Sequence, residues 1–154
     1  MPYYFLKEDL DALRARVREL EEDLRVVGRE LGEACSQSAE TWHDNAPYEE
    51  AVRESKLLSR RLKELVDVLR EAELVTPPSS AAKRVSIGRN VTVLDLDTGE
   101  ELAFTVGSYL VLDNAERRSY RAPLVRLLIL AEEGDIREGK IGNRHRAFEV
   151  VRIE

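Results

Sequence analysis

LDALRARVRELEEDLRVVGRELGEA at residues 10–34 and YEEAVRESKLLSRRLKELVDVLREA at residues 48–72 decide the fold of this chain. In both stretches apolar side chains recur at alternating spacings of three and four residues, with Ser55 as a polar exception. This spacing is the heptad pattern of helices that pack along one seam. Because the two seams match and follow each other closely, we predict an antiparallel coiled-coil hairpin. The seam positions are Leu10, Leu13, Val17, Leu20, Leu24, Val27, Leu31 and Ala34, then Tyr48, Ala51, Ser55, Leu58, Leu62, Leu65, Leu69 and Ala72.

A change in composition predicts where this hairpin ends. We assign residues 1–75 to the coiled-coil hairpin, with its tip at about residues 37–45. VTPPSSAAKR follows, and two prolines beside two serines cannot continue a helix. Residues 76–84 are therefore predicted to be a linker. Residues 85–154, which are richer in Val, Ile and Gly, form a second domain.

The second domain has the pattern of a small sheet with one helix. VTVLDLDTGEELAFTV alternates apolar and polar residues on either side of a turn at Gly99, which predicts a β-hairpin. Two further strands are expected around a turn at Gly142 and Asn143. APLVRLLIL is apolar at helical intervals from Pro123 onward, which predicts a short helix on the sheet. The predicted fold class is α+β.

Charge and composition limit the kind of partner. The formal net charge of −6 gives no reason to expect nucleic acid or an anionic membrane as the main partner. No apolar run approaches the roughly 20 residues that span a bilayer, and the N-terminus does not resemble a signal peptide, so we expect a cytoplasmic protein. Cys35 is the only cysteine, which excludes an internal disulfide and a Cys-rich zinc site. A hairpin that satisfies its own seam favours a monomer.

SAETWHDNAPYEE at residues 38–50 joins the two helices, and helix capping explains part of it. Asp44 or Asn45 can cap the second helix, and the residues that follow suit a first helical turn. Capping does not explain Trp42, which either folds back on the seam or meets a partner. His43 is a solvent-exposed residue or, with acidic neighbours, a metal ligand.

DNAPYEEAVRE and then SYRAPL occur in this order along the chain, and together they resemble motifs of the Gre family of bacterial transcript cleavage factors. DNAPYEEAVRE at residues 44–54 resembles the family's Glu-Asn-Ala-Glu-Tyr followed by Ala at the start of the second helix. SYRAPL at residues 119–124 resembles the family's Ser-x-x-Ser-Pro-Leu, with Ala122 in place of a Ser, and Leu130 stands where a Gly is usual. The ordered similarity covers nearly the whole chain.

The resemblance implies a function and a set of contact residues. An FKBP-like C-terminal domain would dock on bacterial RNA polymerase while the hairpin enters the secondary channel and contacts nascent RNA indirectly. The chain would hold no cofactor of its own and would at most share the Mg²⁺ of the polymerase. The candidate tip residues are Glu40, Thr41, Trp42, His43, Asp44, Asn45 and Tyr48; the candidates for RNA contact are Arg53 and Lys56, and those for docking are Ser119, Pro123 and Asp135.

One carboxylate of the family's tip is absent. The family places an Asp three residues before the Glu that Asp44 matches, and this chain has Thr41 there. A neutral hydroxyl adds no charge to a Mg²⁺ site, and an imidazole such as that of His43 is a poor Mg²⁺ ligand. We therefore expect binding to polymerase with weak or no stimulation of cleavage.

Three alternatives remain open. Glu40 and Asp44 together can serve as an altered acidic pair that keeps cleavage activity. FKBP-like domains also occur in peptidyl-prolyl isomerases, although residues 85–154 offer few aromatic side chains for such a pocket. The third alternative is a structural adaptor whose coiled coil pairs with an unrelated helix.

Overall fold

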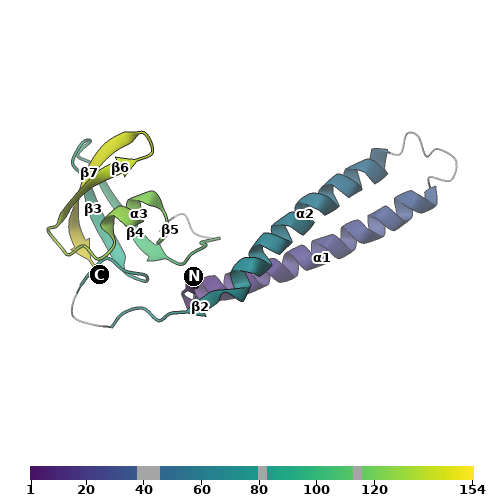
Figure 1. Cartoon of the computed structure of the whole chain (residues 1–154), viewed down its shortest axis with the longest axis horizontal. Coiled ribbons are helices and arrows are strands. Elements are labelled where there is room, and N and C mark those ends of the chain that lie inside the picture. Colours follow the sequence, from purple (N-terminus) through teal and green to yellow (C-terminus); the bar gives the residue numbers. More distant parts are fainter. Residues whose placement is uncertain (38–45, 80–82, 113–115) are drawn as a thin grey trace. The chain divides into compact units, whose positions relative to one another are not determined.

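The computed structural model of the chain describes residues 1–37, 46–79, 83–112 and 116–154 (Figure 1). The chain forms two compact units. We call Leu13–Glu71 the hairpin unit, and Met1–Ala12 together with Ala72–Glu154 the sheet unit. The predicted α+β class is confirmed, since a long helical hairpin precedes the strands of a sheet domain.

The hairpin consists of α1, Lys7–Gln37, and α2, Ala46–Arg70 (Figure 1). Seam side chains are buried or half-buried from Leu13 to Leu31 and from Ala51 to Leu69, as the heptad pattern predicts. The predicted coiled-coil hairpin is confirmed by this burial. The prediction is wrong at both ends of the second seam. Tyr48 is 40% exposed, and Ala72 lies beyond the end of α2.

Five strands form the main sheet of the sheet unit, in the order β5-β4-β3-β7-β6. All neighbours are antiparallel except β4 and β5, which are parallel. The two predicted β-hairpins are confirmed, with Gly99 at φ 76° and Gly142 at φ 63° in their turns. The strand β5 was not predicted. The bounds are β3, Asn90–Asp95; β4, Glu101–Gly107; β5, Arg117–Ser119; β6, Ile136–Ile141; and β7, Arg144–Ile153.

The predicted short helix is α3, Pro123–Leu128, and it covers one face of this sheet. Proline suits the start of a helix because the first amides have no partner within it. The apolar side of α3 packs against the alternate, inward-facing residues of the strands, as one buried face of a sheet requires. The core of the sheet unit includes Leu124, Val125 and Leu128 of α3, with Val91, Val93, Phe104, Val106, Phe148, Val150 and Ile153 of the sheet.

A second, small sheet of two strands holds the N-terminal segment in the sheet unit. β1, Tyr3–Phe5, pairs in parallel with β2, Ala72–Leu74, so that Tyr3 lies opposite Ala72. This pairing explains why the helical seam does not continue to Ala72. Phe5 is fully buried. Residues Met1–Ala12 therefore belong to the sheet unit, whereas the sequence placed them with the hairpin.

The predicted domain limits at residues 75 and 85 stay a prediction. Pro77 of the predicted linker packs closely on Gly88, whose φ is 93°. Within the described part of the chain, no helix has the length and apolarity that crossing a bilayer requires.

Candidate functional site

The end of the hairpin carries the predicted tip, and the structure describes its two flanks. α1 ends at Gln37 and α2 begins at Ala46, and the predicted bend falls between them, outside the described residues. Tyr48 lies in the first turn of α2 and is half-exposed, and seam burial begins one turn later at Ala51. Outside the described residues lie Glu40, Thr41, Trp42, His43, Asp44 and Asn45. Their caps, metal contacts and channel contacts stay predictions.

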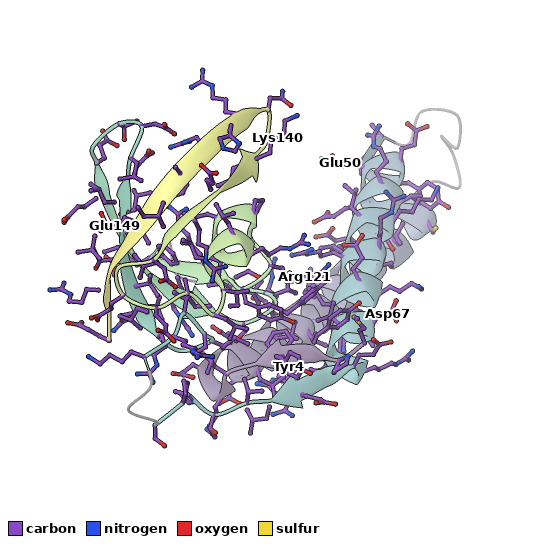
Figure 2. All side chains as sticks on the ribbon, turned by 60° about the vertical axis from the view of Figure 1, so that its left-hand side comes forward. Tyr4, Glu50, Asp67, Arg121, Lys140 and Glu149 are labelled. Atoms are coloured by element: carbon purple, nitrogen blue, oxygen red, sulfur yellow. The ribbon has the colours of Figure 1, made fainter. Side chains whose placement is uncertain are left out.

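Basic side chains on the hairpin fall into two classes. Arg25 pairs with Glu22 at 2.7 Å and Lys63 pairs with Asp67 at 3.1 Å, as expected for a salt-bridged helix surface. Arg53 and Lys56 are exposed on α2, and neither forms an ion pair with any residue in the described ranges. Neither side chain therefore has a direct ion-pair partner on the described helix surface. Figure 2 shows the many charged side chains along α2, with Glu50 and Asp67 labelled.

The three docking candidates lie on the sheet unit, and two of them share one loop. Ser119 ends β5 and Pro123 begins α3 four residues later. The hydroxyl of Ser119 donates to the carbonyl oxygen of Tyr109 at 2.8 Å and accepts from the amide of Arg121 at 3.1 Å. Pro123 is exposed. This loop therefore has a defined shape and leaves the ring of Pro123 open to a partner.

Asp135, the third docking candidate, lies at the start of β6 and also has a local structural role. Its carboxylate accepts a hydrogen bond from the amide of Glu132 at 2.9 Å, across a turn in which Gly134 has φ 90°. Asp135 is exposed. Among the described residues, no hydrogen bond or ion pair joins Asp135 to Ser119 or Pro123. The structure thus brings together two of the three docking candidates.

The sequence analysis missed a polar cluster at the root of α1. Asp9 is 6% exposed, and its carboxylate accepts from Arg117 at 2.7 and 3.0 Å. The same carboxylate accepts from the amide and the hydroxyl of Ser108, at 3.2 and 2.5 Å. The amide of Leu6 donates to that hydroxyl at 2.7 Å. No local sequence signal marks this cluster, because Asp9 lies 99 positions before Ser108 and 108 positions before Arg117.

Tyrosines surround the same N-terminal segment. Tyr3 stacks on Tyr109 with ring centroids 4.1 Å apart, and the carbonyl of Tyr4 accepts from the amide of Tyr109 at 3.0 Å. The amide of Tyr4 donates to the hydroxyl of Tyr120 at 3.3 Å. Tyr4 and Tyr120 also line an apolar cavity of about 460 Å³. Figure 2 labels Tyr4 and Arg121, which both belong to the sheet unit and line a neighbouring hollow.

Metal-binding potential is low in the described ranges. No group of three His, Cys, Asp or Glu side chains there is arranged to hold a metal ion. The carboxylates predicted to approach Mg²⁺, Glu40 and Asp44, lie outside those ranges.

Comparison with known proteins decides the family. The family described as "Transcription elongation factor, GreA/GreB, C-term" matches residues 79–154. "Transcription elongation factor GreA" of Sulfurovum sp. is 31% identical over 152 residues, which cover 98% of this chain and 89% of that protein. The chain belongs to the GreA/GreB family. The GreA of Nitratiruptor sp. is 34% identical over 111 residues, 71% of this chain and 68% of that protein.

Two solved structures align with nearly the whole chain. GreA factor homolog 1 (Gfh1) of Thermus thermophilus gives a TM-score of 0.47 with 24% identity, covering 100% of this chain and 99% of that chain. The GreA/GreB factor of Nitrosomonas europaea gives a TM-score of 0.40 with 17% identity, covering 99% and 98%.

Two departures from the GreA/GreB motifs have visible structural effects. Ala122 occupies the N-cap position of α3 with φ −58° and ψ 140°, and no side chain caps this helix. Leu130, which replaces a usual Gly, has φ 63° and is the one non-glycine residue with positive φ in the described ranges. In both places the backbone conformation of this chain suits the residue that is usual in the family.

Proposed function

We propose that this GreA/GreB family member binds bacterial RNA polymerase, inserts its hairpin into the secondary channel and modulates elongation with weak or no stimulation of transcript cleavage. One observation carries the proposal: the similarity to an elongation factor extends over 98% of the chain and yet Thr41 replaces a tip carboxylate. The chain would act on the hydrolytic activity of the polymerase and would not itself be an enzyme.

The chemistry of the tip explains the expected loss of cleavage. In the family an Asp and a Glu help to hold the second Mg²⁺ of the polymerase and to orient water. Two metal ions at such a site stabilise the attacking and the leaving oxygen atoms. Mg²⁺ favours carboxylate oxygens, so the hydroxyl of Thr41 is a weak substitute. Asp44 is also one methylene shorter than Glu, so its oxygens would reach less far toward the metal.

Features of the described residues support the proposed contacts. Pro123, beside Ser119, is exposed on the sheet unit and is available to dock on polymerase. Arg53 and Lys56 offer positive charge, without ion-pair partners in the described ranges, on the helix that leads to the tip. Phosphate groups of nascent RNA are suitable partners for such side chains. We propose a monomer that needs no membrane.

A backtracked elongation complex provides the test. Labelled RNA is followed after addition of this protein alone, of an active Gre factor, and of both together. We expect no cleavage by this protein alone and reduced cleavage by the added factor, because the two compete for one channel. The absence of measurable binding to bacterial RNA polymerase at micromolar concentration would refute the proposal.

A second candidate keeps the cleavage activity and uses Glu40 and Asp44 as the acidic pair. It is favoured by the position of Glu40 next to Thr41 in the sequence. Glu40→Ala and Asp44→Ala would each abolish cleavage in that case. If wild-type protein cleaves and neither substitution changes the rate, this acidic-pair mechanism fails.

Two further functions have less support. A peptidyl-prolyl isomerase of the FKBP-like type needs an aromatic pocket, but Phe104 and Phe148 are buried in the core of the sheet unit. Tyr109 and Tyr120 contact the N-terminal segment. A proline-peptide isomerisation assay tests this function. A coiled-coil adaptor would need exposed apolar surface on its helices, but most of the seam is buried within the hairpin. Binding of an isolated amphipathic helix in solution tests this function.

A further inference from the structure

The end of the β6–β7 hairpin concentrates positive charge in an acidic chain. Residues 137–146 hold four arginine or lysine side chains and one carboxylate, that of Glu138, which gives a formal charge of +3. The net charge of the whole chain is −6. That total gives no reason to expect a nucleic acid, but a partner responds to the local distribution of charge. Figure 2 labels Lys140, which lies near the end of β6.

Three of these cations have no carboxylate partner. Arg137, Lys140 and Arg144 form no ion pair with any residue in the described ranges. Lys140 and Arg144 are exposed, and Arg137 is half-buried. By contrast Arg84, which is exposed on the same sheet unit, pairs with Glu132 at 3.0 Å. The three unpaired charges are therefore available to an external anion.

The carboxylates beside this end of the sheet are already engaged. Arg146 donates a hydrogen bond to the buried carboxylate of Asp95, and its Nε lies 3.8 Å from a carboxylate oxygen of Asp97. A carboxylate oxygen of Glu138 lies 3.7 Å from Nε2 of His145. Arg146 thus holds the two aspartates that would otherwise attract the unpaired cations.

The strand register spaces the arginines along one face of the β6–β7 hairpin. Arg137 lies opposite Phe148, so the two side chains share a face. Arg146 and Arg144 lie on that face too, because alternate residues of a strand point the same way. Successive arginines in this row are about 7 Å apart, a spacing similar to that of neighbouring phosphates in a nucleic acid strand. By the same alternation Lys140 lies on the opposite face.

The other side chains at this end favour a phosphate backbone over a protein surface. Protein interfaces are centred on buried apolar or aromatic anchors. Residues 137–147 contain no Phe, Tyr or Trp, and the side chain of Ile141 packs against the core of the sheet unit. Guanidinium groups, in contrast, match the geometry of phosphate oxygens. Without aromatic rings that stack on bases, binding should depend on salt more than on base sequence.

We propose that the end of the β6–β7 hairpin is a nucleic-acid-binding surface, on which Arg137, Lys140 and Arg144 bind backbone phosphates. This basic surface belongs to the sheet unit and is separate from the candidate RNA contacts Arg53 and Lys56 on α2. It goes beyond the proposed function, because it requires neither polymerase nor the tip of the helical hairpin. Single-stranded RNA and duplex DNA offer the same phosphate chemistry, so the experiment has one arm for each.

Fluorescence anisotropy of short labelled RNA and of short labelled duplex DNA, titrated with the full-length chain, tests the proposal. We expect dissociation constants of about 10 to 100 μM, and a weakening of roughly tenfold or more between about 50 and 200 mM salt, as about three phosphate contacts require. Arg137→Glu with Lys140→Glu and Arg144→Glu should weaken binding at least about tenfold. The polymer that wild type binds more tightly identifies the source of the phosphates.

A variant with the same change in net charge is the control. Lys83→Glu with Arg84→Glu and Arg152→Glu alters three exposed cations elsewhere on the sheet unit and should keep the affinity within about threefold. Equal losses in both triple variants would overturn the proposal, because they would indicate a general charge effect. A loss confined to Arg53→Glu with Lys56→Glu would place the binding on α2 and overturn it as well.

Two further readouts identify the surface and the class of partner. In nuclear magnetic resonance spectra of the wild-type chain, the amide signals of residues 137–146 should shift most when RNA or DNA is added. Shifts confined to other residues would overturn the proposal. A poly-glutamate peptide should bind at least about tenfold more weakly than the nucleic acid, and equal affinity would assign the surface to acidic proteins instead. Failure of the chain to bind polymerase would reject the proposed function and leave these results unchanged.

Discussion

Leu130 adopts a backbone conformation that favours glycine, and this has a measurable cost. Its φ is 63°, its amide donates to the carbonyl of Val85 at 2.8 Å, and its side chain is 61% exposed. We expect Leu130→Gly to stabilise the protein by about 1 kcal/mol, because it relieves the positive φ and loses little buried surface. Thermal or urea unfolding measures this. Leu130→Ala is the control, because it removes the exposed side chain but keeps the unfavourable positive φ. An equal gain in stability for Leu130→Ala would show that the side chain, and not the backbone conformation, causes the effect.

Asp95 makes the stability of the sheet unit depend on pH. Burial by itself would raise the pKa of Asp95, but hydrogen bonds from the amide of Asp97, from Arg146 and from the amide of Thr98 outweigh it, so the pKa lies below the usual value of an aspartate. A lowered pKa contributes stability that is present above the unfolded value and is lost as pH falls through the folded value. The contribution should therefore be complete near neutral pH and should decline below about pH 4.

The comparison of wild type with Asp95→Asn isolates this contribution. All other titrating groups are common to both proteins, so their effects cancel in the difference between the unfolding free energies. We expect wild type to be the more stable at pH 6 and the difference to shrink as pH falls from about 5 toward 3. Urea unfolding at each pH provides the measurement, and a difference that grows toward low pH would contradict the assigned direction of the pKa shift.

Thr41 is the residue on which the proposed loss of cleavage depends. Thr41→Asp restores a carboxylate at the position where the family has one, and the added charge should favour Mg²⁺ binding. We expect RNA cleavage in backtracked complexes to rise by at least about tenfold. Thr41→Asn, which has a similar shape without the charge, should remain at the wild-type level. Equal rates for both variants would show that the missing charge does not limit cleavage.

At the scale of one helix, two sets of basic side chains on α2 differ in whether they form ion pairs. Arg53 and Lys56 form no ion pair with the described residues, whereas Arg61 and Lys63 pair with acidic neighbours at 3.5 and 3.1 Å. We expect Arg53→Glu with Lys56→Glu to weaken binding to backtracked complexes by roughly tenfold and to reduce the dependence of binding on salt. Arg61→Glu with Lys63→Glu changes the net charge equally and serves as the control. Equal losses would indicate a general charge effect without specific RNA contacts.

At the scale of the whole molecule, the sheet unit is discontinuous in sequence. Residues 76–154 alone lack β1 and Asp9, so the ring of Tyr109 loses its contact with Phe5 and Arg117 loses its carboxylate. We expect this fragment to melt more than about 5 °C below a protein in which residues 1–12 are joined to residues 72–154 by a flexible Gly/Ser linker. Calorimetry of both proteins decides this, and equal melting temperatures would show that residues 1–12 contribute nothing to the unit.

The sequence by itself determined the helical hairpin, four of the strands, the short helix α3 and the family. Heptad spacing predicted both helices of the hairpin, alternation around Gly99 and Gly142 predicted four strands, and Pro123 marked the start of α3. These patterns are local, because the side-chain periods of helices and strands are visible within a few residues. The motifs that resemble the Gre family lay in the same readable segments, and the comparisons confirmed the family.

Tertiary structure alone decided how the N-terminal segment is used. An aspartate in the first turn of a helix is usually explained by the helix dipole, so Asp9 carried no signal of burial. Its partners Ser108 and Arg117 lie far from it along the chain. The same is true of Tyr3 and Ala72, which pair between β1 and β2. Such contacts depend on how finished elements pack together, and no local periodicity encodes them. The contacts made by the first turn of α1 therefore became visible only in the folded chain.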